Sequence, residues 1–399
     1  MDLSYPFVSP APLEPPPEWA ELRATCPVAP ITLPSGDGAS LLTRYDDVRA
    51  VLSDPRCTRA LNADDAARLT DSETGGVFNN PNTLTIPQTG EGHQRWRQAI
   101  GRWFTARRMA ALRPEIEAVA ERLVDDMTAS GHPADLKAGL GFPLPVWVIC
   151  ELLGVPASDR ERFAYWSDTF LNLDRYSTAE IEAAQEKFVA YISGHVAAKR
   201  YRPGDDLLSE LITGPDGAGG WMSDPQLVFT GQALLVAGHE TTANMITKMM
   251  AMLLADRTRW ERLLADPKLV RTTAEEALRF DANPGFGMPR YVNEDVEVDG
   301  TVLHRGTTVV CSMASANHDE RAFESADGMD LGRSPNPHLA FGAGPHSCLG
   351  QALARTELQA VLSVLLRKLP TIELAAEPGD LRRIEGLVVG GLRELPVRW

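Results

Sequence analysis

The stretch 341–350 constrains this chain more than any other part of its sequence. It reads Phe-Gly-Ala-Gly-Pro-His-Ser-Cys-Leu-Gly, and a strongly helix-forming run begins directly after it at Gln351. Cys348 therefore lies where a glycine-rich loop becomes the N-terminus of a helix. Unpaired backbone N–H groups and the positive end of the helix dipole favour a thiolate at that place. The glycines also allow the backbone to approach a flat, bulky ligand closely.

Two interpretations of Cys348 compete. An isolated cysteine in a glycine turn is usually a buried packing residue. A thiolate held in a cradle of N–H groups suits one axial ligand of a haem iron. The complete spacing Phe-Gly-x-Gly-x-His-x-Cys-x-Gly favours the second interpretation. At these residues the chain resembles the cytochrome P450 superfamily, the haem-thiolate monooxygenases.

Composition excludes several other classes of protein. The formal net charge of −15 argues against nucleic acid as a main partner, because phosphate binding needs a basic surface. The five cysteines are scattered and contain no C-x-x-C pair. That pattern is typical of a reducing compartment rather than of a disulfide framework or a zinc site.

The N-terminal segment has neither a basic n-region nor an apolar h-region. The longest apolar run, 227–238, is shorter than a bilayer span. We therefore expect a cytoplasmic protein without a membrane segment. We further expect one domain over 1–399, in which the proline-rich residues 1–20 form an extended, unstructured leader on the surface.

The periodicity of apolar residues predicts a mainly α fold with a smaller β region, an α+β class. Hairpins are predicted around 31–44 and 296–303, and strands at 307–312, 387–389 and 395–397. Helices are predicted at 45–52, 92–104, 109–130, 143–153, 159–171, 178–200, 205–212, 224–255, 267–281 and 349–369. Residues 58–90 have no clean period, and such a long irregular segment is often a binding loop.

The middle of the predicted helix 224–255 carries the run Ala-Gly-His-Glu-Thr-Thr at 237–242. A mid-helix glycine costs about 1 kcal/mol relative to alanine, so a reason for Gly238 is expected. We expect the helix to open at Gly238 and leave room for dioxygen. Thr241 would then offer its hydroxyl and Glu240 would link to water, forming a proton-delivery pair. The family pattern Ala/Gly-Gly-x-Asp/Glu-Thr matches these positions.

Two other interpretations of this run exist. One is a helix with a polar patch. The other is a zinc site, because His239 and Glu240 begin an H-E-x-x-H motif, but Ala243 occupies the position of the second ligand.

His93 and Arg97 stand four residues apart on one predicted helix face. The resemblance implies that they bind the haem propionates, which need cationic or donor partners. It implies the same for Arg290 and His346. The remaining predicted cofactor contacts are Phe341, Gly342, Gly350, Ala237 and Gly238.

Glu276 and Arg279 stand at i,i+3 on another predicted helix. As an isolated pair they would be a surface bridge of little energetic value. The family carries Glu-x-x-Arg as a buried network that locks the loop before the cysteine. Arg333 is the best candidate for its third, basic partner.

The resemblance implies a fold of triangular outline, with haem b between the long central helix and the helix after Cys348. It implies insertion of one oxygen atom of O2 into a largely apolar small molecule, with hydroxylation as the expected outcome, in bacterial specialised metabolism. Electrons would come from NAD(P)H through a ferredoxin reductase and a ferredoxin, and the protein would be a monomer. Epoxidation, aryl coupling and peroxide-driven oxidation remain alternatives on the same fold. A non-catalytic haem sensor is a further alternative, which Glu240 and Thr241 disfavour.

Three segments are predicted to line the substrate pocket, by their order relative to the family motifs. They bring Leu234, Leu235, Phe286, Gly287, Met288, Leu387 and Val388. These positions carry little besides apolar groups and backbone, so binding should depend on apolar burial and shape.

Overall fold

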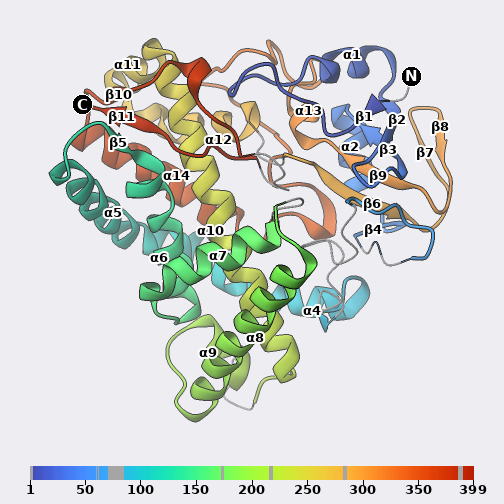
Figure 1. Ribbon diagram of the computed structural model, residues 1–399, viewed down its shortest axis with the longest axis horizontal. Helices are drawn as coiled ribbons and strands as arrows, with labels where there is room; N and C mark the ends of the chain where they lie inside the picture. Colours follow the sequence, from blue (N-terminus) through green and yellow to red (C-terminus); the bar gives the residue numbers. More distant parts are fainter. Residues whose placement is uncertain are drawn as a thin grey trace.

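The computed structural model describes residues 3–59, 61, 63–70, 85–171, 175–214, 219–281, 285–384 and 390–399. Most of this part of the chain is helical, and a smaller β region lies beside the N-terminus (Figure 1). The outline is triangular, and α8 (Thr178–Tyr201) and α9 (Leu207–Thr213) lie at its narrow end (Figure 1). The predicted fold class and outline are confirmed.

Three of the other helices, at 18–25, 257–265 and 313–317, were not predicted, and the rest agree closely with the predicted positions. These other helices are α1 (Glu18–Thr25), α2 (Tyr45–Ser53), α4 (Gly90–Gly101), α5 (Ala106–Ala129), α6 (Pro143–Leu153), α7 (Arg160–Leu171), α10 (Asp224–Ala255), α11 (Arg257–Ala265), α12 (Val270–Phe280), α13 (Met313–Asn317) and α14 (Gln351–Lys368). A π-helical turn, η3 (Lys137–Gly141), precedes α6. The start of α10 is fixed locally, because the side chain of Gln226 accepts a hydrogen bond from the N–H of Ser223 at 3.0 Å.

The strands form three sheets in the described part of the chain. The largest has the order β1 (Leu3–Ser4), β2 (Val28–Thr32), β3 (Gly38–Leu42), β9 (Thr308–Cys311), β6 (Met288–Val292) and β4 (Cys57–Thr58). A second joins β10 (Glu373–Leu374), β11 (Pro396–Arg398) and β5 (Ala134–Asp135), and β7 (Val296–Val298) pairs with β8 (Thr301–Leu303). Both predicted hairpins are confirmed. The strand predicted at 387–389 lies outside the described residues, and β6 was not predicted.

The prediction of an unstructured surface leader over residues 1–20 is wrong. Leu3 and Ser4 pair in parallel with β2, and α1 already begins at Glu18. Tyr5 is buried, and its hydroxyl donates a hydrogen bond to the carbonyl of Phe286 at 2.6 Å. The prolines keep this segment extended, as expected, but the extended chain is anchored against the sheet instead of lying free.

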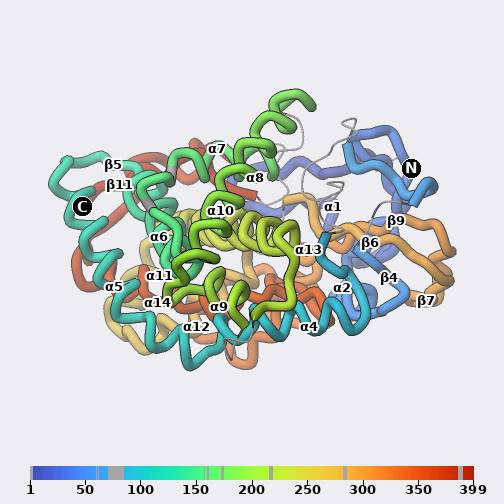
Figure 2. The backbone as a smooth tube through the Cα atoms, turned by 90° about the horizontal axis from the view of Figure 1, so that it is seen from below, coloured from blue at the N-terminus to red at the C-terminus, as the bar shows by residue number. Residues whose placement is uncertain are grey.

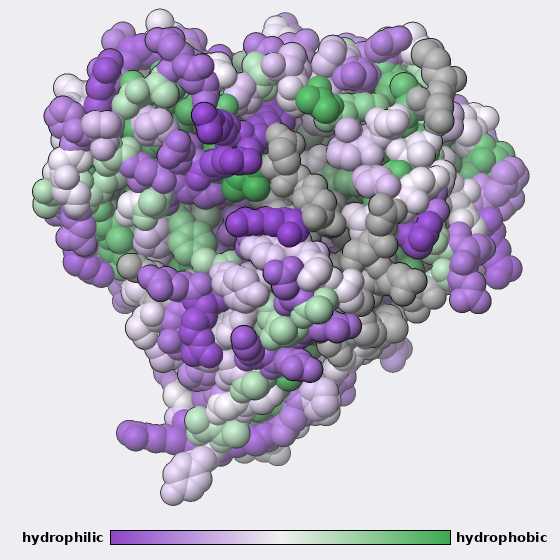
Figure 3. Space-filling model, in the orientation of Figure 1, coloured by the Kyte–Doolittle hydropathy of each residue, from purple (hydrophilic) through white to green (hydrophobic). Residues whose placement is uncertain are grey.

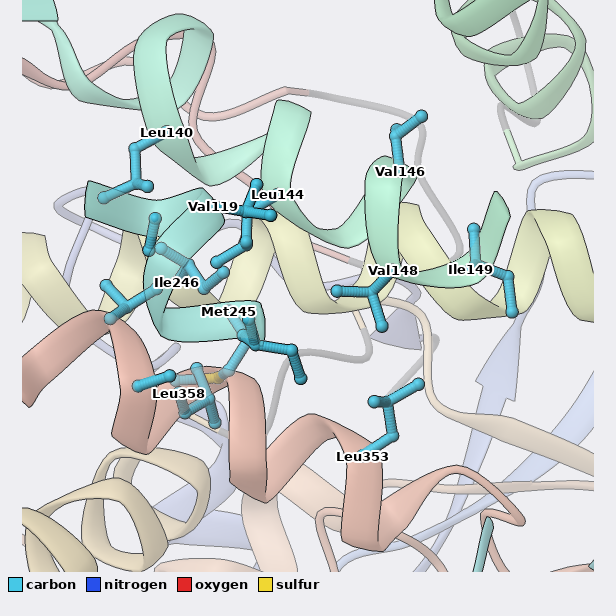
Figure 4. Packing of buried hydrophobic residues seen from close by; sticks show 14 of the residues in the cluster. Val119, Leu140, Leu144, Val146, Val148, Ile149, Met245, Ile246, Leu353 and Leu358 are labelled. Carbon is cyan, nitrogen blue, oxygen red and sulfur yellow. The ribbon is translucent and has the colours of Figure 1, made fainter. Parts of the chain in front are cut away.

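The long helix α10 runs through the middle of the helical part in both views (Figures 1 and 2). It packs against α6, α8 and α14. Apolar side chains from α6, α10 and α14 meet there, among them Val148, Met245 and Leu358 (Figure 4). All three are at most 3% exposed, so this contact forms the centre of the main hydrophobic core.

Hydrophilic residues cover much of the face seen in Figure 3, and the apolar residues on it form small separate patches. Among the described residues, no helix is long and apolar enough to cross a membrane.

Glu276 is the centre of a buried charge network. Its side chain and that of Arg279 are 0% exposed and face each other at 2.8 Å. The same carboxylate accepts hydrogen bonds from Arg333 Nε and from Asn336 Nδ2, each at 3.0 Å. The sequence alone left open a surface bridge, but this pair is fully buried and Arg333 is its third partner.

Arg279 extends this network to the chain that leads toward Cys348. Its guanidinium donates to the carbonyls of Asn317 and Ala326 at 2.7 and 2.8 Å, and to that of Gly328 at 2.9 Å. Glu276 and Arg279 thus join α12 to 317–336. This segment directly precedes the cysteine loop, so the network positions the base of that loop.

Glu276→Ala is expected to lower the stability of the protein by about 3–5 kcal/mol, because it leaves two buried guanidiniums without their carboxylate. Glu261→Ala is the matched control, since Glu261 is 64% exposed and pairs with Arg257 on a helix surface. The measurement is the yield and melting temperature of haem-loaded protein. Equal yields and melting temperatures for the two variants would show that the network does not stabilise the haem-loaded protein.

Candidate active site

The loop before α14 has a backbone that requires glycine at two places. Gly342 and Gly344 both have φ of +68°, in the left-handed region. A Cβ on Gly344 would lie 2.6 Å from Cα of Ser53, so the loop also packs tightly against α2. The N–H of Cys348 donates to the carbonyl of Phe341 at 2.7 Å and closes the loop. These contacts fix the direction of the Cys348 side chain.

Cys348 is exposed, unlike Cys57, Cys150 and Cys311. Burial nevertheless raises the pKa of its thiol, and the N–H of Gly350 partly offsets that effect. A group that is accessible and yet surrounded by protein atoms lies in a concave part of the surface. The thiol can therefore meet a ligand there, and a cation on that ligand would favour its thiolate form.

One short part of α10 is accessible within a long buried run. Between Leu235 and Leu254, every residue is buried except Ala237, Gly238, Glu240 and Thr241. Ala237 is exposed. These residues follow one another along little more than one turn, so α10 has one solvent-accessible turn at the predicted motif.

The prediction that α10 opens at Gly238 is wrong. The helix is continuous from Asp224 to Ala255. A Cβ on Gly238 would lie 2.7 Å from Cδ1 of Ile149, which α6 directs toward α10 (Figure 4). The structure therefore explains Gly238 by the close approach of α6, not by a gap in the helix.

The polar side chains of the motif have local partners. The hydroxyl of Thr241 donates to the carbonyl of Ala237 at 2.8 Å, as is common for threonine within a helix. The carboxylate of Glu240 accepts from Asn244 Nδ2 at 3.1 Å. His239 is fully buried, and its Nδ1 lies 2.6 Å from the carbonyl of Leu235. His239 thus belongs to the core, whereas Glu240 and Thr241 remain accessible.

The predicted basic residues lie together near the cysteine loop. Arg97 donates to the carbonyl of Ser347 at 2.8 Å, next to Cys348. The rings of His93 and His346 have centroids 4.4 Å apart. Burial, followed by nearby positive charges of which Arg59 is the strongest, lowers the pKa of His346 to about 3. These imidazoles are therefore neutral near pH 7 and can accept or donate one hydrogen bond at each ring nitrogen.

Arg59 belongs to this basic cluster and was not predicted. It follows the short strand β4, at the start of the irregular segment 58–90, where no periodic pattern indicated a direction for its side chain. Its place is indicated only by the structure, because Arg59 follows Cys57 and Thr58, which pair with the strand that carries Arg290.

The cluster fits a group with two carboxylates and a metal that prefers sulfur. Arg290 is 2% exposed, and its Nε has no hydrogen-bond partner in the described part of the chain. Buried guanidiniums are stable only when anions accompany them. The two propionates of haem would bind these basic groups, and its iron would bind Cys348.

Comparison with known proteins agrees with this fit. The family model described as cytochrome P450 matches residues 161–377. Nocardicin C N-oxygenase of Nocardia uniformis subsp. tsuyamanensis is 40% identical, over 99% of this chain and 98% of its own. The chain belongs to the cytochrome P450 family. Mycinamicin IV hydroxylase/epoxidase of Micromonospora griseorubida is also 40% identical, over 96% of this P450 and 94% of its own chain. A solved structure described as a putative thioether synthase of griseoviridin tailoring has a TM-score of 0.92 at 38% identity, and each chain is covered completely.

This P450 is accordingly a haem monooxygenase. It carries haem b, uses O2, and receives electrons from NAD(P)H through redox partners.

Two of the predicted pocket residues belong to the core. Leu235 is 0% exposed within the main cluster, and Phe286 is 2% exposed and packs edge-to-face on Tyr5 at 5.3 Å. The predictions for these two side chains as pocket walls are wrong, because the N-terminal segment and neighbouring helices cover them.

The other pocket predictions are not contradicted. Leu234 and Met288 are half-buried, and Gly287 is buried with φ of +91°. Leu387 and Val388 lie outside the described residues, as does much of the irregular segment 58–90.

Gly238→Ala is expected to destabilise the P450 although alanine is the better helix former, because the added methyl overlaps Ile149. We expect a loss of about 1 kcal/mol. Adding Ile149→Val, which removes Cδ1, should cost less in this background than in the parent. The check is a thermal-unfolding double-mutant cycle, and strictly additive effects would show that the two residues do not compete for space.

Proposed function

We propose that this P450 hydroxylates a largely apolar small molecule in bacterial specialised metabolism. The observation that carries the proposal is the accessible turn of α10, with Glu240 and Thr241, on a helix that packs against the helix following Cys348. Two of the relatives act on nocardicin C and mycinamicin IV according to their names, which supports this class of substrate. Epoxidation is the alternative outcome, since the second relative is named for both reactions.

Cys348 is the proposed axial ligand of the iron. The N–H of Gly350 and the guanidiniums of Arg97 and Arg355 all lower the pKa of this thiol, which opposes the larger effect of its burial. An iron cation would complete the stabilisation of the thiolate. The haem, when bound, supplies the activation of dioxygen. The loop contributes by holding the sulfur in one direction, through the hydrogen bond from the N–H of Cys348 to the carbonyl of Phe341.

Glu240 and Thr241 are the proposed proton-delivery pair. The hydroxyl of Thr241 donates to the carbonyl of Ala237, and a hydroxyl oxygen can also accept hydrogen bonds. Asn244 holds the carboxylate of Glu240 from the same helix. Glu240 would link this hydroxyl to water as the source of protons. A gas or redox sensor would need no such pair.

His93, Arg97, Arg290 and His346 are the proposed propionate partners. The loop residues Phe341, Gly342 and Gly350, with Ala237, would contact the faces of the ring. Leu234, Gly287 and Met288 are the remaining described candidates for the substrate wall, to which Leu387 and Val388 would add. We further propose a single domain over 1–399, a monomeric and cytoplasmic protein, and a ferredoxin with its reductase as the electron donors.

Cys348→Ala is expected to abolish the red-shifted absorption of the reduced carbon monoxide complex, because that shift depends on a thiolate opposite carbon monoxide. The spectrum of the reduced, carbon monoxide-saturated protein is the measurement. Cys57→Ala serves as the control, since Cys57 is buried in strand β4. An unchanged spectrum for Cys348→Ala would remove this residue from the site.

Thr241→Ala is expected to bind substrate and consume reductant but to release much of the oxygen as peroxide. The physical reason is the loss of the hydroxyl that positions a proton on the reacting oxygen. The measurement is the ratio of product and peroxide to NAD(P)H consumed. Thr242→Ala is the matched control, because Thr242 is the next residue and is buried. Coupling in Thr241→Ala equal to that of the parent would contradict the relay and favour a sensor.

A further inference from the structure

Arg59 directly follows strand β4, which pairs with the strand that carries Arg290. In the pairing of β4 with β6, Cys57 lies opposite Val292 and Thr58 opposite Tyr291. Arg59 is the residue after Thr58, and Arg290 is the residue before Tyr291, so this pairing brings the two arginines close together. Two like charges held close together in this way repel each other. The sheet therefore brings two guanidiniums together without any local benefit.

The surroundings of these arginines add further positive charge. Burial, with the charges of Arg290 and Arg97, lowers the pKa of Arg59 to about 10. Arg59 also contributes to the lowered pKa values of His93 and His346. Arg59 is therefore near the predicted propionate partners.

The position of Arg290 limits how the repulsion can be relieved. Its Nη1 donates to the carbonyl of Pro289 at 2.8 Å, whereas its buried Nε has no partner in the described residues. Arg290 is only 2% exposed, and burying a guanidinium without an anion costs free energy of folding. A second arginine close to it increases that cost. A carboxylate bound by both guanidiniums would satisfy the free N–H and cancel the repulsion.

We propose that Arg59 and Arg290 together clamp one haem propionate, while Arg97 holds the other. This assignment depends on the proposed haem site and adds to it a residue outside the family motifs of this chain. The alternative carboxylate would come from a substrate. The propionate is favoured because Arg59 is near enough to Arg97, His93 and His346 to interact with them electrostatically.

The clamp has an electrostatic consequence. Three guanidiniums face two carboxylates, so one positive charge remains near the edge of the haem. Reduction of the iron adds one negative charge, which this excess positive charge favours. Arg59 therefore raises the reduction potential of the P450 as well as retaining the cofactor.

The test compares Arg59→Met, Arg59→Lys and the control Arg56→Met as haem-loaded proteins. Arg56 is three residues away, 43% exposed, and pairs with Asp54 on the surface. The first measurement is the rate at which ferric haem transfers to excess apomyoglobin. The second is the ferric/ferrous midpoint potential.

Arg59→Met should lose haem at least about tenfold faster, the effect of one lost charged hydrogen bond, and should have a lower potential. Arg59→Lys should keep the potential but lose haem at an intermediate rate, because it retains the charge without the planar fork. Arg56→Met should match the parent in both. All three should keep the red-shifted carbon monoxide band; its absence from the parent would instead contradict the proposed thiolate site.

The proposal is overturned if Arg59→Met loses haem at the same rate as the parent and has the same midpoint potential. If those values are parental and Arg59→Met only weakens the binding of carboxylate-bearing compounds, the substrate is the source of the anion and the propionate clamp is likewise overturned. Should Arg59→Met fail to fold, Arg59→Lys decides, since parental haem loss in that variant contradicts the clamp.

Discussion

The position of the cysteine loop depends on one fully buried carboxylate, that of Glu276. A buried charge is tolerated only when its partners satisfy it completely, and losing one partner costs several kcal/mol. Glu276 binds Arg279 and Arg333, and Arg279 in turn binds carbonyls of the chain before the loop. The segment cannot shift without breaking several of these contacts at once. Its rigidity is what allows Cys348 to stay accessible in a defined direction.

A second constraint is a charge imbalance that the polypeptide does not resolve by itself. Arg59, Arg97 and Arg290 converge with two histidines, and the charges that lower the pKa of His346 are positive. Such an arrangement opposes folding unless carboxylates join it. The propionates of the proposed haem site would supply these carboxylates, so haem loading and stability would be coupled through the same side chains.

The sequence predicted those elements whose signals are local. Cys348 was proposed as a ligand from the loop spacing, and α10 begins where the adjacent Asp224 and Pro225 predicted a helix start. Predictions failed where distant segments meet. Phe286 was assigned to the pocket from its order relative to the family motifs, yet Tyr5, 281 positions earlier, covers it. Arg59 could not be predicted because its place depends on the pairing of the preceding residues, Cys57 and Thr58, with β6. Gly238 was read as an opening, because Ile149 on another helix could not be foreseen.

The central claim is that a haem bound in this site takes its protein ligand from sulfur and not from nitrogen. His346 lies two residues before Cys348, and the ring of His93 is 4.4 Å from that of His346, so these two imidazoles are the rival ligands. X-ray absorption at the iron edge of the ferric, haem-loaded protein measures the ligand directly. The account predicts one sulfur neighbour at bonding distance in addition to the four ring nitrogens. A first shell made only of nitrogen and oxygen would contradict it.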